Sequence, residues 1–269
     1  MSNRDWVEPA TFLLCEVGSG VHGIAQEGTD DHDEMGVCLE PYHLAQGIQE
    51  TFEQHILRTA AIREAKHDAP SQPGDTDRTI YSLRKWTRLA LKGNPSVILL
   101  LFAPSSSVRK INARGEQLRE LAPAFVSRTA GAHYLGYLQA QRMRLLGERG
   151  QKNVNRQDLV AKFGYDTKYA GHMVRLGYQG VELLSTGKIS LPMPEEQRAH
   201  VLRIRRGEEA LNDVLTATGY LENELRDLCP TSPLPERPNT SLVEQFMLDL
   251  YFESWRAARF LEQPDLVHP

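Results

Sequence analysis

The chain contains 269 residues, 41% hydrophobic and 25% charged, as is typical of a globular protein with one large or two small domains. Its formal charge of −4 is unevenly distributed, because residues 1–80 carry 15 acidic and 5 basic side chains, a net of −10, and the remainder carries a net of +6. An acidic first part suits cation binding and a basic remainder suits a polyanionic substrate, whereas solvated surfaces with no binding role would give the same balance.

We expect neither a membrane protein nor a protein stabilised by disulfide bonds. The N-terminus lacks the apolar core of a signal peptide, and the longest apolar run, Val97–Ala103, is too short to span a bilayer, so we expect a cytoplasmic protein that does not bind membranes. The three cysteines, Cys15, Cys38 and Cys229, show no Cys-x-x-Cys spacing and therefore indicate neither a zinc knuckle nor a disulfide framework.

The first part of the chain favours a small mixed α/β unit. Short apolar runs between glycine, proline and polar loops predict strands at 11–17, 31–39 and 51–57, and a short strand at 79–81. Turn-forming residues at 64–78 predict a loop. From Ser82, apolar side chains recur on one helical face until Gly93, and Asn94-Pro95 then begins a second helix that should be deeply buried.

After Pro104 the sequence predicts an almost wholly helical chain. Helices are expected at 112–121, at 123–147, from Asp166 to Gly187, from Pro194 onward and at 207–228, with a polar loop at 148–157. A capping box at Ser241 begins a last amphipathic helix. We therefore expect an α+β fold made of an α/β lobe (1–105), a helical lobe (106–228), a Pro-rich linker (229–240) and a C-terminal helix (241–269), with the ligand between the lobes.

One stretch combines a turn suited to phosphate with two carboxylates. Gly18-Ser19 follows the first apolar run, and Asp31 and Asp33 open the second predicted strand. Residues at i and i+2 of a strand lie on the same face, so the two carboxylates could share divalent cations, which in turn hold substrate phosphates. The pattern indicates phosphoryl or nucleotidyl transfer.

The order Gly-Ser, spacer, Asp-x-Asp resembles the nucleotidyltransferase superfamily related to DNA polymerase β. A longer set of stretches is similar to the RNA-ligase-associated predicted nucleotidyltransferases of bacteria and phages, and this likeness covers roughly residues 11–190. The stretches are Gly-Ser-Gly-Val-His-Gly, Asp-Asp-His-Asp-Glu-Met-Gly-Val, Ser-Leu-Arg-Lys-Trp, Leu-Lys-Gly-Asn-Pro and Tyr-Asp-Thr-Lys-Tyr-Ala-Gly-His-Met-Val-Arg-Leu. The resemblance implies a palm-like α/β lobe followed by a helical lobe.

The resemblance also implies roles for the motif residues. Ser19 would hold the β- and γ-phosphates of an NTP, and Gly18 would let the backbone approach them closely. Asp31 and Asp33 would ligate two Mg²⁺ ions, for which Mn²⁺ could substitute. The family adds a third carboxylate from a neighbouring strand, and Asp77 is the candidate because it precedes the predicted strand 79–81.

Two points of this assignment leave alternatives. Asp75 is nearly as good a candidate for the third carboxylate as Asp77. The family commonly has Ser or Thr directly before the first metal-binding Asp, whereas this chain has Asp30 there. A site made of Asp30 and Asp33 would have i, i+3 spacing and would not share a strand face, so the Asp31 and Asp33 pair is preferred.

Basic residues in the predicted helical lobe form a second candidate group. Lys168, His172 and Arg175 lie at i, i+4 and i+7 on one helical face, where they could bind the triphosphate or the acceptor, or could form a solvated basic face. His22, in the Gly-rich loop, could contact phosphate or be an ordinary turn histidine. Lys85 is expected near the edge of the site.

The leading hypothesis is a Mg²⁺-dependent nucleotidyltransferase that moves an NMP from an NTP to a hydroxyl and releases pyrophosphate. An RNA end is the first expectation for the acceptor; a protein side chain, a small molecule or another polyanion are the alternatives. No helix-turn-helix, RRM or zinc-finger pattern occurs, so sequence-specific DNA binding is not expected. Two other readings are a metal phosphohydrolase using His32-Asp33 and His67-Asp68, and a catalytically silent nucleotide-binding module.

Overall fold

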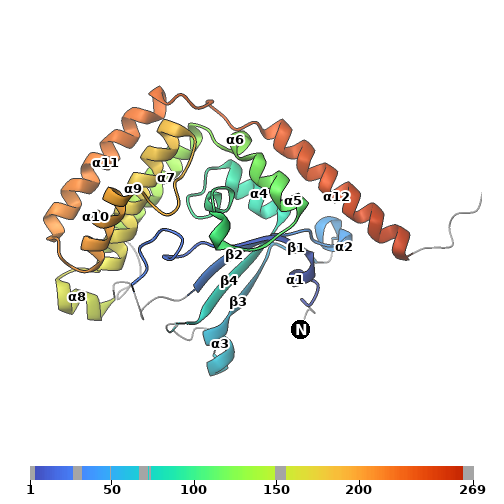
Figure 1. Cartoon of the computed structure of the whole chain (residues 1–269), viewed down its shortest axis with the longest axis horizontal. Coiled ribbons are helices and arrows are strands. Elements are labelled where there is room, and N and C mark those ends of the chain that lie inside the picture. Colours follow the sequence, from blue (N-terminus) through green and yellow to red (C-terminus); the bar gives the residue numbers. More distant parts are fainter. Residues whose placement is uncertain are drawn as a thin grey trace, which may run out of the picture.

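A mixed β-sheet forms the base of the fold (Figure 1). The computed structural model describes residues 4–26, 32–48, 50–66, 72, 74–148 and 156–262, with side chains to residue 257. Within these residues, five strands form one sheet in the order β3-β4-β2-β1-β5. The strands are β1 (Thr11–Glu16), β2 (His32–Cys38), β3 (Gln54–Arg58), β4 (Thr76–Ser82) and β5 (Val108–Ile111). β2 and β4 are parallel, and the other neighbours are antiparallel.

The two faces of the sheet are buried in different hydrophobic cores. Side chains alternate along a strand, so Met35 and Val37 of β2 enter the main core while Cys38 enters a smaller one on the other face. The smaller core lies beneath α1 (Val7–Ala10) and α2 (Tyr42–Gln46) and includes Ile80 of β4. By the same alternation Asp33 shares the main-core face of β2, at the end of the strand where the apolar residues stop.

Helices that follow the sheet strands cover its main-core face. α4 (Leu83–Leu91) begins at Ser82, whose hydroxyl accepts a hydrogen bond from the backbone N–H of Lys85 at 3.1 Å. Gly93, with a φ of +70°, ends this helix region as the sequence predicted. The apolar run that follows is buried and contains the 3₁₀ helix η1 (Ile98–Leu101). The other elements near the sheet are α3 (Thr59–Glu64), α5 (Ala113–Glu120) and α6 (Ala122–Phe125).

A group of long helices stands beside the sheet, at the left of Figure 1. Its members are α7 (Thr129–Leu145), α8 (Gln157–Phe163), α9 (Thr167–Thr186), α10 (Glu195–Arg205) and α11 (Leu211–Thr231). α9 is the central helix, since it packs against α7, α10 and α11. Asp166 caps α9 as predicted, and its carboxylate accepts from the backbone N–H groups of Lys168 and Tyr169, both at 3.0 Å.

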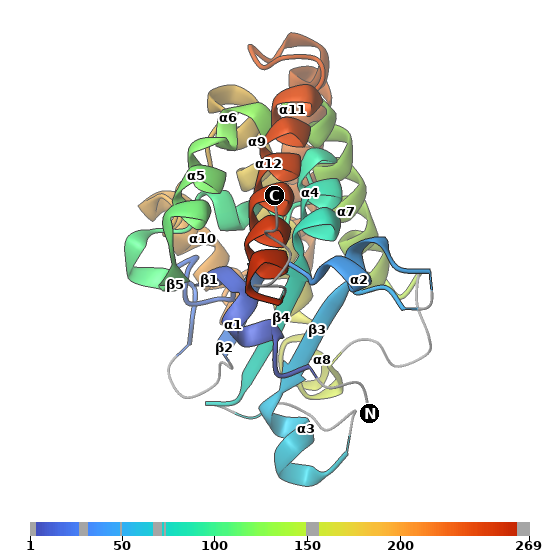
Figure 2. The same ribbon diagram turned by 90° about the vertical axis from the view of Figure 1, so that its right-hand side faces the viewer.

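The last helix, α12 (Thr240–Glu262), returns to the sheet side of the molecule. It crosses the face turned to the viewer in Figure 2 and contacts α4 and α6. The Tyr251 hydroxyl donates to the buried Glu40 carboxylate at 2.8 Å and accepts from the backbone N–H of Arg84 at 3.1 Å. The Trp255 indole donates to the Glu40 carbonyl at 3.2 Å. The C-terminal helix is therefore attached to α4 and to Glu40, two residues beyond the end of β2, through one buried polar cluster.

The α+β fold class is confirmed, but several predicted elements are wrong. The chain after Pro104 is not wholly helical, because β5 adds an edge strand to the sheet beyond the expected lobe boundary at residue 105. Its central residues, Arg109 and Lys110, are exposed, so it lacks an apolar pattern. β4 begins at Thr76, inside the predicted loop, and α3 and α8 were not predicted.

Helix boundaries also differ from the expectation. The helix expected after Asn94-Pro95 is only the short η1, and the long helix predicted at 123–147 is divided into α6 and α7. α11 continues to Thr231, into the predicted linker, and Asn239 rather than Ser241 caps α12, since its side chain accepts from Leu242 N–H at 3.1 Å. In the described residues, no helix is long and apolar enough to cross a membrane.

We predict that Tyr251→Phe destabilises the protein. Removing the hydroxyl leaves a buried carboxylate and a backbone N–H without this partner, which should lower the free energy of unfolding by about 1–3 kcal/mol. Urea unfolding followed by circular dichroism measures the change. Tyr220→Phe is the matched control, because Tyr220 is 73% exposed and should tolerate the same change. Equal unfolding midpoints for the two variants would contradict the predicted role of the cluster.

Candidate active site

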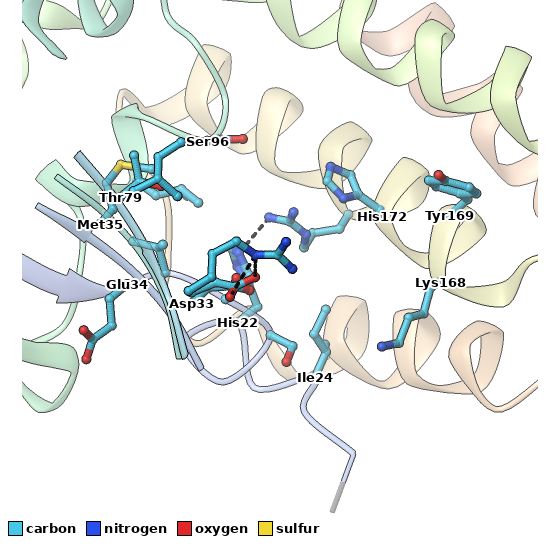
Figure 3. Close-up of a pocket in the computed structure, with 18 of the residues that line it drawn as sticks. His22, Ile24, Asp33, Glu34, Met35, Thr79, Ser96, Lys168, Tyr169 and His172 are labelled. Carbon is cyan, nitrogen blue, oxygen red and sulfur yellow. Dashed lines mark hydrogen bonds and ion pairs between the residues drawn. The ribbon is translucent and has the colours of Figure 1, made fainter. Parts of the chain in front are cut away.

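A cavity of about 630 Å³ lies between the sheet and the long helices. Figure 3 shows His22 and Asp33 on the sheet side, with Lys168, Tyr169 and His172 opposite them on α9. The lining residues come from the turn after β1, from strands β2, β3 and β4, from the segment before and within η1, and from α9 and α10. The cavity therefore collects side chains from segments far apart in the sequence.

The Gly-rich turn is tied to the beginning of β2. The Val17 N–H donates to the Asp33 carbonyl at 2.9 Å, which brings Gly18 against the Asp33 side chain. A Cβ atom on Gly18 would lie 2.6 Å from Asp33 Oδ2 and 2.9 Å from Asp33 Cβ, so only glycine fits here without a shift. Ser19 is the next residue of the turn, and both Gly18 and Ser19 line the cavity.

Two carboxylates meet on neighbouring strands at the base of the cavity. Asp33 of β2 and Asp77 of β4 are paired in the parallel register, and both line the cavity. Asp31 and Asp30 lie outside the described residues. In the described residues no group of three His, Cys, Asp or Glu side chains forms a metal site. The donors that are present, carboxylate oxygens, nevertheless suit Mg²⁺ or Mn²⁺, and the Arg58 guanidinium already contacts Asp77, so this position accepts positive charge.

Asp75, the alternative third carboxylate, occupies a different environment. Its oxygens accept from the Arg63 guanidinium at 2.5 Å, the Thr59 hydroxyl at 2.9 Å and the Gln72 N–H at 2.7 Å. The hydrogen bond from Arg63 is the main reason that the pKa of Asp75 is lowered to about 2. Asp75 does not line the cavity, and its contacts are those of a residue that shapes the turn before β4.

Cationic side chains form the opposite wall. Lys168, His172 and Arg175 all line the cavity, as the shared helical face would place them. Arg205 of α10 joins them, and its guanidinium donates to the carbonyl of Ile24. Arg156 also lines the cavity and lies over the Tyr169 ring, 5.3 Å from its centroid. The wall therefore presents several positive groups to the two carboxylates.

His22 fixes the turn to this wall. Its imidazole is 2% exposed, and its Nε2 lies 2.7 Å from Arg175 Nη1 while its Nδ1 lies 3.1 Å from Gln179 Nε2. Arg175 also donates to Gln179 Oε1 at 2.9 Å. His22 thus links the turn to α9 through buried contacts. The expectation that it contacts phosphate stays a prediction.

The electrostatics of the wall keep both histidines neutral. Burial, followed by the charge of Arg175, lowers the pKa of His172 to about 3 and holds the pKa of His22 well below its usual value. Burial also lowers the pKa of Arg175 to about 10, with Arg205 acting in the same direction and Tyr134 and Asp33 opposing it. Arg175 remains charged at neutral pH, so the positive groups of the wall are arginine and lysine.

Several lining residues were not found from the sequence. Arg58 lies one residue beyond the predicted third strand, and Arg156 lay in a predicted polar loop. Arg205 and Gln179 gave no motif signal, because they become relevant only through their neighbours in space. Lys85 does not line the cavity; its ammonium pairs with Glu53 at 3.2 Å and lies 5.9 Å from the centroid of the Tyr81 ring, which does.

The fold is consistent with a polymerase β-like lobe followed by a helical region, and its mixed sheet carries in-register aspartates on two parallel strands with the Gly-Ser turn beside them. The family model described as the RNA repair pathway DNA polymerase beta family, RlaP, matches residues 7–249. The chain belongs to this family. A search of curated proteins finds no similar sequence. The family supports an enzyme of the nucleotidyltransferase class, and such enzymes generally use divalent metals.

We predict that His22 and His172 stay neutral below the pH at which a free imidazole takes up a proton, because burial lowers the pKa of His172 to about 3 and holds the pKa of His22 well below its usual value. Because their pKa values are lowered in the folded protein, their contribution to stability should be present above pH 6.5 and lost as the pH falls. Nitrogen-15 NMR of the imidazoles measures both pKa values. Arg175→Met should raise the pKa of His172, whereas Arg226→Met, which changes an arginine 47% exposed on α11, should not. Equal His172 titration in both variants would contradict the assigned cause.

Proposed function

We infer that the protein is a divalent-metal-dependent nucleotidyltransferase that moves an NMP from an NTP to a hydroxyl of an RNA end and releases pyrophosphate. The observation that carries this inference is the division of one cavity into an acidic base and a cationic wall. Asp33 and Asp77 form the base, and Lys168, Arg175 and Arg205 belong to the wall. Family membership supports the same class of reaction and an RNA-repair setting.

The cationic wall supports a triphosphate as the donor. Arg175 and Arg205 carry like charges on the same wall, and after burial the charge of Arg205 is a further reason that the pKa of Arg175 is lowered. A bound polyanion would relieve this repulsion and accept hydrogen bonds from the guanidinium groups. The Gly18-Ser19 turn, at the other side of the same cavity, offers a hydroxyl and backbone N–H groups to the phosphates.

Asp33, Asp77 and, by the family pattern, Asp31 would hold the metal ions. Bound divalent cations supply activation of the acceptor hydroxyl and neutralise charge on the departing pyrophosphate. In the transfer, the acceptor oxygen bonds to the α-phosphorus, the bond from that phosphorus to the bridging oxygen of pyrophosphate breaks, and the hydroxyl proton passes to water. The wall residues orient the phosphates so that attack and departure are in line.

The alternative of a phosphohydrolase gains no support from the described residues. His32 is exposed and alternates with Asp33 along β2, so the two side chains leave opposite faces of the sheet. The second His-Asp pair, His67-Asp68, lies outside the described residues. A catalytically silent nucleotide-binding module can be distinguished from an enzyme only by measuring turnover, as the next experiment does.

We predict that Asp33→Asn and Asp77→Asn each lower nucleotidyl transfer by about 10²-fold or more, since a lost metal ligand removes several kcal/mol of transition-state stabilisation. The measurement incubates the protein with Mg²⁺, each labelled NTP and RNA, and follows label transfer and pyrophosphate. Asp75→Asn should keep transfer near the wild-type rate, although its turn contacts weaken. Phosphate release without transfer would favour a hydrolase, and NTP binding without turnover a silent module.

We also predict that Gly18→Ala reduces transfer while the fold persists. The added Cβ must push the Asp33 side chain out of place, and a displacement of about 1 Å in a reacting group can cost about 10²-fold. Gly136→Ala on α7 is the matched control, because its Cβ would meet nothing within 4 Å. Transfer assays and thermal unfolding of both variants test this. A Gly18→Ala variant with full activity would show that the turn does not position Asp33.

A further inference from the structure

Two arginine–aspartate pairs link the β3–α3 segment to β4, and they differ in kind. Arg63 and Asp75 form the tight pair, in which Asp75 also accepts from Thr59 and from the Gln72 N–H. Arg58 and Asp77 form the other pair, and Asp77 lies two residues further along the chain, in β4 and inside the cavity. The contacts of the first pair hold the turn before β4 in shape. Both residues of the second pair line the cavity, so its role needs a separate explanation.

The Arg58–Asp77 contact has the geometry of an exchangeable pair. A single nitrogen, Nε, lies 3.3 Å from each carboxylate oxygen, which is longer than a well-formed charge-assisted hydrogen bond. The side chains of Arg58 and Asp77 are 29% and 26% exposed, so water screens their attraction. Such a contact holds the carboxylate in place without locking it.

A metal ion on Asp77 would compete with Arg58. Both are cations that seek the same carboxylate, and their mutual repulsion weakens whichever contact forms second. Under the proposed function Asp77 is a metal ligand, so metal binding should release the Arg58 guanidinium from this carboxylate. Once it has left Asp77, the guanidinium can donate hydrogen bonds to another anion within the reach of its side chain.

The wall around Arg58 fits the end of a nucleic acid strand. Ile56 lies two residues earlier on the same face of β3, is 54% exposed and lines the cavity. Thr79 and Tyr81 of β4 line the same side, and the β3–β4 register sets Ile56 opposite Thr79 and Arg58 opposite Asp77. An apolar and aromatic surface beside a planar guanidinium suits a nucleobase next to a phosphate.

We propose that Arg58 is a positioning residue that exchanges partners: it holds Asp77 before the metal binds, and binds a backbone phosphate of the RNA acceptor once the metal occupies Asp77. The proposal rests on the proposed function, and it adds the acceptor side of the cavity, along β3 and β4. Because metal binding releases the phosphate-binding group, metal and RNA strengthen each other's binding, and this coupling is reciprocal.

The test measures binding rather than turnover. Mn²⁺ binding to the full chain is followed by electron paramagnetic resonance, and binding of a short single-stranded RNA by fluorescence anisotropy, with and without Mn²⁺. Arg58→Gln should bind Mn²⁺ about fivefold more tightly than wild type, because the ion no longer has to displace Arg58 from Asp77, an attraction comparable to that of two unit charges about 4 Å apart in water. Arg63→Gln, which changes the arginine outside the cavity, should bind Mn²⁺ as the wild type does.

RNA binding gives the second readout. In the presence of Mn²⁺, Arg58→Gln should lose one phosphate contact, which lowers the slope of log affinity against log salt by about 0.7. Without Mn²⁺ the two slopes should agree. Arg58→Lys, which keeps the charge, should retain wild-type Mn²⁺ affinity, and it provides a second variant if Arg58→Gln fails to fold.

The outcomes separate this proposal from the function on which it rests. Unchanged or weaker Mn²⁺ binding by Arg58→Gln, with normal binding by the wild type, would overturn the exchange and leave the nucleotidyltransferase intact. The exchange would also be overturned if, in the presence of Mn²⁺, wild type and Arg58→Gln had equal slopes of log RNA affinity against log salt. A wild-type protein that binds no Mn²⁺ would overturn both.

Discussion

The parallel pairing of β2 with β4 is the constraint on which the candidate site depends. It sets Asp33 beside Asp77, and the antiparallel pairing of β3 then sets Arg58 opposite Asp77. A slip of β4 by one residue would turn Asp77 to the other face of the sheet and withdraw Ile80 from the smaller core. The burial of Ile80 therefore fixes, through the strand register, which acidic side chain reaches the cavity.

The helical wall carries a buried positive charge, which lowers the stability of the folded protein. Burial lowers the pKa of Arg175 and the nearby charge of Arg205 acts in the same direction, while Arg175 is held by the neutral groups His22 and Gln179. Within the described residues Arg175 forms no ion pair, although Asp33 acts on it at longer range. Buried charge of this kind weakens the folded state, and such arrangements concentrate at functional sites. The neutral His22 explains how the wall keeps its position, because it accepts contact from arginine without adding a further positive charge.

The elements that could be predicted are those with a local signal. Strand β1, the start of α4 after Ser82 and the Asp166 cap of α9 each follow from a few adjacent residues. β5 could not be predicted, since its exposed Arg109 and Lys110 give no apolar period. Only the strand register shows that Asp77 lines the cavity and Asp75 does not. Arg58 and Arg205 could not be found because their partners are distant in sequence. Site residues within motifs are thus visible in the sequence, whereas those that adjust the charge of the site are not.

The Gly-rich turn is held on both sides, and this has a consequence for how the cavity can change shape. Val17 attaches it to β2, while the carbonyl of His22 accepts from the Met193 N–H at 3.2 Å and the carbonyl of Ile24 accepts from Arg205. The turn therefore cannot swing separately from the sheet and the helices. The half of the cavity next to it is preorganised, so a ligand bound there loses little affinity to reordering of the protein. The opposite half of the cavity, at the edge strand β3, is better able to change shape for a second ligand, because the Arg58–Asp77 contact there is long and partly exposed.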